Sequence, residues 1–159
     1  DLVRSRGLGD VYKRQEKDLV ETVLPYRPLF IKPNKDELEV MFNTTVKSDE
    51  DVIKYGKEIL KKGAQSVIIS LGGDGAIYVD QHQSIKAVNP QGHVVNTVGS
   101  GDSTVAGMVA GLSMGLNIDE AFQQAVASGT ATAFSEDLAT RDAIENIKSQ
   151  VTISVLDGE

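Results

Sequence analysis

The residues best suited to chemistry lie in the stretch 96–107, where two glycines flank a serine and an aspartate follows directly. Gly99 and Gly101 permit a tight turn and let a ligand approach backbone N–H groups. The small, apolar residues that follow predict a helix from Gly99 to about Met114. The start of such a helix attracts anions, because its first N–H groups are unpaired and its dipole is positive there. Asp102 could either cap this helix or act as a general base beside a bound phosphate.

A second polar group follows the apolar run 28–31, which predicts a short buried strand. Asn34 is a good N-cap, and Glu37 lies three residues on, as in a capping box. Capping alone explains both residues. Alternatively, the strand end directs Lys32, Asn34 and Glu37 into a crevice at the carboxyl edge of a sheet, where ligands of open α/β folds bind.

A third group, the glycine-rich stretch 72–75, follows a β-branched run at 66–71 that is typical of a strand buried on both faces. Strands are predicted next at 76–79 and 84–88. Taken alone, this stretch favours a hairpin turn over contact with a phosphate or nucleotide.

The remaining elements must position these groups. Small side chains at 127–131 would let their helix lie close to another backbone or to a flat ligand. The order of elements predicts an α/β sandwich with a mainly parallel sheet. Further helices are expected at 16–24, 48–63, 117–134 and 140–149, and further strands at 94–98 and 151–155.

Composition narrows the class of protein. A formal net charge of −7 argues against non-specific binding to nucleic acid or to an anionic membrane, and the absence of cysteine fits a cytoplasmic protein. The longest apolar run, 105–116, is shorter than the ~20 residues of a membrane-spanning helix. Residues 1–15 carry net charge +2 and have no clear period. They are either an extraneous leader or an ordinary loop of a truncated protein.

Two common nucleotide motifs, the P-loop and the dinucleotide fingerprint, are missing from the sequence. The stretch 96–109 instead resembles the C-terminal signature of the ribokinase-like sugar kinases, the PfkB family. Residues 32–37 resemble that family's K-P-N and N-x-x-E elements, and residues 70–75 are similar to its S-x-G-x-x-G turn. The resemblance implies a ribokinase-like three-layer sandwich, of which residues 16–159 would be only the C-terminal, nucleotide-binding half.

The resemblance also implies roles for individual residues. Asp102 would accept the proton of the acceptor hydroxyl, while the N–H groups of Gly99, Ser100 and Gly101 would form an anion hole for the transferred phosphoryl group. Asn34 and Glu37 would hold Mg²⁺, largely through water. The residues implied to contact ATP are Lys32, Ser70, Gly72, Gly75 and Ser128. A K⁺ site formed by the backbone carbonyls of Asn96 and Val98 is a further implication.

Within this family, residues 32–38 and 128–141 are most similar to kinases that phosphorylate fructose 1-phosphate at its 6-hydroxyl to give fructose 1,6-bisphosphate. Kinases of tagatose 6-phosphate are the alternative, and a non-catalytic nucleotide-binding module is a second one. The family's N-terminal half carries most of the sugar site and a lid through which many members dimerise. We therefore expect the parent protein to be an enzyme that forms a homodimer through this lid, and the isolated chain to be inactive.

Overall fold

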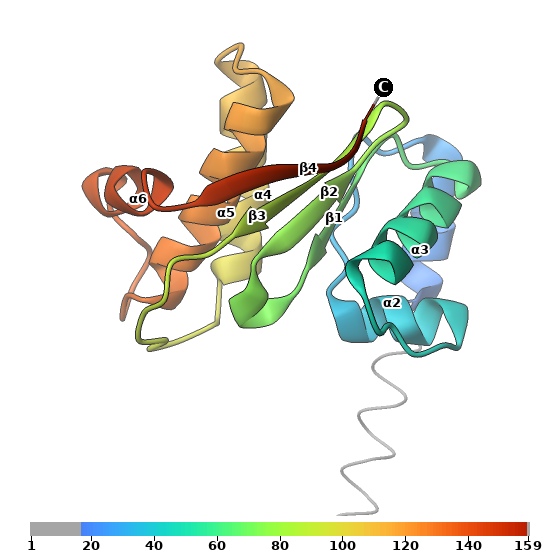
Figure 1. The fold of residues 1–159 in the computed structure, drawn as a ribbon, viewed down its shortest axis with the longest axis horizontal. Coiled ribbons are helices and arrows are strands. Elements are labelled where there is room, and N and C mark those ends of the chain that lie inside the picture. Colours follow the sequence, from blue (N-terminus) through green and yellow to red (C-terminus); the bar gives the residue numbers. More distant parts are fainter. Residues whose placement is uncertain (1–16, 159) are drawn as a thin grey trace, which may run out of the picture. The chain divides into compact units, whose positions relative to one another are not determined.

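The computed structural model describes residues 17–158, which form two compact units (Figure 1). The first unit contains residues 17–71 and 77–84, and the second contains residues 72–76 and 85–158. Residues 17–23 are helical and run into a 3₁₀ turn at Leu24–Tyr26. The other helices and strands are α2 (Lys35–Phe42), α3 (Asp49–Lys62), β1 (Val67–Ser70), β2 (Ala76–Val79), β3 (Gln83–Val88), α4 (Ser100–Ser113), α5 (Ile118–Ala133), α6 (Arg141–Lys148) and β4 (Thr152–Gly158).

The helices of the first unit begin and end where the sequence predicts. The Asn34 side chain accepts a hydrogen bond from the Glu37 N–H at the start of α2, and Ser48 accepts one from Asp51 at the start of α3. Gly63 ends α3 with φ +135°, and a side chain there would collide with the Leu24 carbonyl oxygen. A glycine is therefore required at this position by both the backbone conformation and the space.

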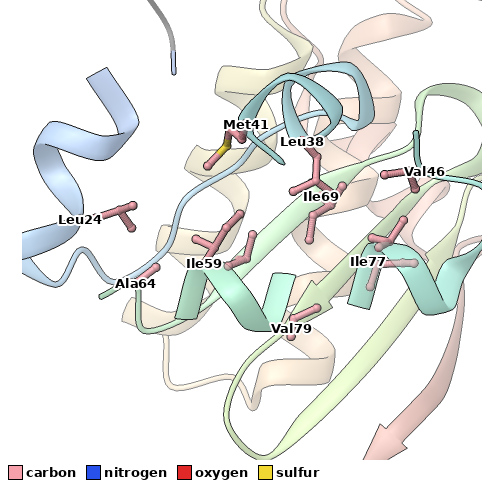
Figure 2. Packing of buried hydrophobic residues seen from close by; sticks show 11 residues of the cluster. Leu24, Leu38, Met41, Val46, Ile59, Ala64, Ile69, Ile77 and Val79 are labelled. Carbon is pink, nitrogen blue, oxygen red and sulfur yellow. The ribbon is translucent and has the colours of Figure 1, made fainter. Parts of the chain in front are cut away.

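The core of the first unit lies between its two helices and one face of its strands (Figure 2). Val67 and Ile69 alternate along β1 and are fully buried, as expected for one face of a strand. Gly56 lets α3 approach β2 closely, because a Cβ there would lie 3.0 Å from Val79 Cγ2. The cluster consists of Leu24, Leu38, Met41, Val46, Val52, Ile59, Ala64, Val67, Ile69, Ile77 and Val79.

Four strands form a sheet in the order β1-β2-β3-β4, which places the strand predicted at 151–155, β4, at an edge. The connections from β1 to β2 and from β2 to β3 are too short for a crossover, so these strands run antiparallel. The parallel pairing expected of the fold is seen at Ile31, which bridges Val67, and at Asn34, which bridges Ser70. Pro33, which lacks an N–H, interrupts this segment, so the strand expected at 28–31 is reduced to isolated bridges.

The second unit is built around α5, which packs against α4, α6 and β4. Gly107 and Gly111 of α4 face α5, and a Cβ at either position would lie about 3 Å from an α5 backbone atom, namely 2.9 Å from Ala125 Cα and 3.0 Å from Ala121 Cα. Of the small residues predicted at 127–131 to permit close packing, Gly129 does so against the neighbouring helix, since a Cβ there would lie 2.9 Å from the Ser100 carbonyl oxygen.

The strand predicted at 94–98 is wrong. These residues form no strand and are exposed, Val98 to 79%. The N–H groups of Val95 and Asn96 both donate to one acceptor, the Ala133 carbonyl at the end of α5, at 2.9 and 3.1 Å. A β-branched run is thus held against a helix end, where its N–H groups meet a carbonyl and not a neighbouring strand. The leader predicted at 1–15 lies outside the described residues, among which no helix is long and apolar enough to cross a membrane.

Candidate active site

The start of α4 is an open helix N-terminus. Its N-cap is Gly99, which has φ +80° and no side chain with which to cap the helix. Only Leu138 Cδ2, at 3.8 Å, comes within 4 Å of a Cβ built on Gly99. The start of α4 thus has no side-chain cap, and an uncapped helix start is a ready anion-binding position.

Ser100 is more constrained than the sequence suggests. Its N–H and its hydroxyl both donate to the Thr97 carbonyl, at 3.2 and 2.8 Å. In this arrangement the Ser100 N–H is already paired, so Gly99 and Gly101 are the better-placed members of the predicted anion hole.

Asp102 is the third residue of α4 and is exposed. It is not the N-cap, since Gly99 holds that position. A carboxylate in the first turn interacts favourably with the helix dipole and lies beside the same open N–H groups. This location fits the general-base interpretation of Asp102 better than the capping one.

The first unit gathers the predicted phosphate and metal residues at the end of β1. Ser70 N donates to the Pro33 carbonyl at 3.0 Å and thereby sets Asn34 beside Ser70. Lys32 and Ser70 are half-buried, while Asn34 is exposed. This segment does end at the carboxyl edge of a parallel pair, as the sequence predicts.

Asn34 and Glu37 form a complete capping box. Asn34 N donates to Glu37 Oε2 at 3.0 Å, Asn34 Nδ2 to Glu37 Oε1 at 3.1 Å, and Glu37 N to Asn34 Oδ1 at 2.8 Å. Each of these oxygens keeps a second lone pair, and oxygen donors of this kind suit Mg²⁺. Across residues 17–158 no cluster of three or more His, Cys, Asp or Glu side chains could hold a metal ion. The lone pairs that remain on the Asn34 and Glu37 oxygens are what fit these residues to contact Mg²⁺ through water.

The stretch 72–75 forms a 3₁₀ turn at Gly72–Asp74 between β1 and β2. Gly75 is buried with φ +94°, and a side chain there would collide with the Ala87 carbonyl. Gly75 is thus explained by packing. Gly72 is exposed, and no atom lies within 4 Å of a Cβ built on it, so its surroundings leave room for a ligand.

Ser128 lies in the interface between α4 and α5. It is 6% exposed, its hydroxyl donates to the Gln124 carbonyl of its own helix at 2.8 Å, and it faces Gly107 in the interface between α4 and α5. The structure thus gives Ser128 a packing role, and its contact with the adenine stays a prediction.

A group of hydroxyls that supports the start of α4 was not predictable from the sequence. Thr132 Oγ1 donates to Ser103 Oγ at 2.9 Å, and Thr104 Oγ1 donates to the Ser100 carbonyl at 3.0 Å. The nearest signal is the run of small residues at 127–131, which predicts close approach to another backbone or to a flat ligand.

Comparison with known proteins identifies the class to which this fold and these motifs belong. The sequence model of the pfkB family carbohydrate kinases matches residues 8–144. The chain therefore belongs to the PfkB family of carbohydrate kinases. The fold is that of the ribokinase-like kinases, since the chain superimposes with a TM-score of 0.68 on 40% of ribokinase from Arabidopsis thaliana, at 21% identity over 75% of this chain.

Individual relatives are more similar. The chain is 43% identical over 130 residues to the 1-phosphofructokinase of Bacillus subtilis, covering 82% of this chain and 43% of the relative. It is 40% identical over 134 residues to the D-tagatose-1-phosphate kinase of Bacillus licheniformis, covering 84% and 44%. The chain thus spans a little under half the length of these curated relatives.

Two solved structures are also similar. A Staphylococcus aureus protein provisionally named a phosphofructokinase has a TM-score of 0.88 and 82% identity over 89% of this chain and 46% of that one. Phosphofructokinase-2 of Escherichia coli, solved in complex with potassium, has a TM-score of 0.75 and 31% identity over 82% and 43%.

Proposed function

We propose that this chain is the C-terminal, nucleotide-binding half of a cytoplasmic kinase that transfers the γ-phosphoryl group of ATP to the 6-hydroxyl of fructose 1-phosphate. The observation that carries the proposal is the uncapped start of α4, where Gly99 leaves N–H groups open to an anion and Asp102 lies in the same turn. The similarity to a 1-phosphofructokinase supports the choice of substrate.

The reaction assigned to the start of α4 is transfer of the γ-phosphoryl group of ATP to the sugar hydroxyl. The Asp102 carboxylate takes the proton of the 6-hydroxyl while the oxygen of that hydroxyl bonds to the γ-phosphorus. The bond between the γ-phosphorus and the β,γ-bridging oxygen breaks, which releases ADP. The N–H groups of Gly99 and Gly101, with that of Ser100 if it leaves Thr97, stabilise the charge on the transferring group.

The other predicted residues bind the nucleotide and its metal. Mg²⁺, when bound, shares the charge of the β- and γ-phosphates. Asn34 and Glu37 hold its water ligands, and Lys32 contacts the phosphates. The same proposal assigns contact with the nucleotide to Ser70, Gly72, Gly75 and Ser128. It assigns K⁺ to the carbonyls of Asn96 and Val98, in line with the potassium complex of the Escherichia coli enzyme.

A second candidate substrate comes from the tagatose kinase among the relatives. Its name specifies D-tagatose 1-phosphate, not the 6-phosphate that the sequence had suggested. Like fructose 1-phosphate, this ketose 1-phosphate offers a free 6-hydroxyl, so the role of Asp102 would be the same.

The test uses a chimera in which this chain replaces the segment that it matches in the Bacillus subtilis relative. ADP release is measured with ATP, Mg²⁺ and either fructose 1-phosphate or D-tagatose 1-phosphate, for the chimera, its Asp102→Asn variant and the 159-residue chain alone. We expect the chimera to turn over fructose 1-phosphate and the Asp102→Asn variant to release ADP about 10²- to 10⁴-fold more slowly. The 159-residue chain alone should show no activity.

Preference for tagatose 1-phosphate would replace the proposed substrate. A chimera that binds ATP but phosphorylates neither sugar would instead favour a non-catalytic nucleotide-binding module. Activity of the 159-residue chain alone would overturn the expectation that catalysis requires the N-terminal half found in its relatives.

A further inference from the structure

The start of α4 rests directly on α5. A Cβ at Gly129 of α5 would collide with Thr104 Oγ1 and would lie 2.9 Å from the Ser100 carbonyl oxygen. Ser100 and Thr104 are themselves joined, because the Thr104 hydroxyl donates to the Ser100 carbonyl at 3.0 Å. At Gly129 the backbone of α5 thus packs against the Thr104 hydroxyl and the Ser100 carbonyl, which belong to the start of α4 around Asp102.

One turn further along α5, a buried hydroxyl holds the same turn of α4. Thr132 is 4% exposed, and its Oγ1 donates to Ser103 Oγ at 2.9 Å. Ser103 follows Asp102 directly, and its N–H donates to the Gly99 carbonyl at 2.9 Å. Ser103 therefore connects the α5 hydroxyl to the N-cap of α4 on one side and to Asp102 on the other.

The same end of α5 also fixes the loop that leads into α4. Thr130 Oγ1 donates to Asn89 Oδ1 at 2.9 Å, and the Ala133 carbonyl accepts the N–H groups of Val95 and Asn96. The chain is thus held by α5 both before and after Gly99, and the uncapped turn between these two attachments depends on α5 for its orientation.

We infer that Thr132 is a positioning residue, whose hydroxyl holds Ser103 and so aims Asp102 and the N–H groups of Gly99 and Gly101 at the transferring phosphoryl group. The inference rests on the proposed function. Small errors in the placement of reacting groups reduce the rate of the chemical step more than they weaken substrate binding. Removal of the Thr132 hydroxyl should therefore lower kcat and leave the KM for ATP nearly unchanged.

The test compares three variants of the chimera described above. Thr132→Val keeps the shape and removes the hydroxyl, and Thr132→Ser keeps the hydroxyl. Ser135→Ala removes a hydroxyl just beyond the end of α5 that donates to the Ala131 carbonyl and not to α4. We expect Thr132→Val to lower kcat about three- to tenfold with less than about a twofold change in KM for ATP. Thr132→Ser and Ser135→Ala should stay within about twofold of the unsubstituted chimera.

A double variant tests whether Ser103 is the partner through which Thr132 acts. If it is, Ser103→Ala combined with Thr132→Val lowers kcat no further than Thr132→Val alone, because both substitutions remove the same interaction. Additive losses would contradict this coupling and overturn the inference.

A second readout on the 159-residue chain needs no activity. Amide hydrogen exchange should become faster at 100–104 in Thr132→Val and stay unchanged there in Ser135→Ala. Unchanged exchange in Thr132→Val would overturn the inference. If the chimera is active, loses activity in Asp102→Asn and is indifferent to Thr132→Val, only the positioning role fails. If the chimera transfers no phosphoryl group, the proposed function fails, and the exchange result alone decides whether Thr132 orients the turn.

Discussion

Several helices in residues 17–158 carry a carboxylate at their third position, namely α2 (Glu37), α3 (Asp51), α4 (Asp102) and α5 (Glu120). The carboxylates of α2 and α4 have different surroundings. Glu37 of α2 folds back onto its N-cap, Asn34, in a capping box of three hydrogen bonds. Asp102 of α4 follows an N-cap, Gly99, that has no side chain to return such a bond. The start of α2 is therefore satisfied by its own residues, whereas the start of α4 is open to a ligand.

The difference shows that a carboxylate in the first turn of a helix does not by itself indicate function. Both carboxylates gain from the helix dipole. What separates them is the residue three positions earlier: an asparagine there forms a closed local network, while a glycine leaves the N–H groups and the carboxylate available. In the proposed function, Asn34 and Glu37 would act on Mg²⁺ as a pre-formed pair, because the capping box already fixes both side chains.

The largest effect should come from removing the two carboxylates in turn, which would break the comparison if both behaved alike. In the chimera, Asp102→Asn should lower kcat by about 10²- to 10⁴-fold, because the amide cannot accept the proton of the acceptor hydroxyl. Glu37→Gln preserves the capping box, since glutamine also serves at that position, and should mainly raise the Mg²⁺ concentration needed for half-maximal rate. Steady-state ADP release across a Mg²⁺ titration measures both.

Equal losses of kcat in Asp102→Asn and Glu37→Gln would mean that the two carboxylates act in the same step. That outcome would contradict the assignment of a closed start to α2 and an open one to α4.

A smaller effect is expected from opening the closed helix start. Asn34→Ala removes the acceptor for the Glu37 N–H and should lower the free energy of unfolding by about 1 kcal/mol, the usual cost of losing an N-cap. Asn34→Ser, which keeps a capping hydroxyl, should lose less. Urea unfolding of the 159-residue chain, followed by circular dichroism, measures both. An unchanged midpoint in Asn34→Ala would show that the capping box contributes nothing to stability.

The sequence predicted features that depend on a few neighbouring residues. The helix starts at Asn34, Ser48 and Asn117 are confirmed because a capping side chain bonds only two or three residues along the chain. The strands β2 and β3 are confirmed for the same reason, since a short polar turn joins them. The glycine turn before α4 was equally visible, because its conformation is set by Gly99 itself.

Features that depend on how distant segments pack were not predictable in this way. The run at 94–98 has the composition of a strand, yet its N–H groups bond the end of α5. The bond between Thr132 and Ser103 spans 29 residues and exists only because Gly129 lets two helices approach closely. Ser128 shows the same limit, since its burial against Gly107 follows from that packing and not from its own neighbours.

The smallest expected effect concerns a second hydrogen-bonded carboxylate of the first unit, Asp80, which pairs with Tyr78. Tyr78 is buried there, and its hydroxyl donates to Asp80 Oδ2 at 2.9 Å. Burial, followed by this hydrogen bond and the charge of Asp80, raises the pKa of Tyr78 well above its ordinary value. The folded chain therefore keeps the phenolic proton at a pH where the unfolded chain releases it.

The sign of the pH dependence follows from this difference. Below about pH 10 both states hold the proton and stability is unaffected, but above it the unfolded state binds fewer protons, so the free energy of unfolding falls as pH rises toward the folded-state pKa. Between pH 8 and pH 10.5 this effect should lower the free energy of unfolding by at most about 1 kcal/mol. Tyr78→Phe, which has no phenolic proton, should lack this contribution while lysine titration affects both proteins. Urea unfolding at the two pH values measures it, and an identical decline in both would mean that the Tyr78 hydroxyl is no more shielded in the folded chain than in the unfolded one.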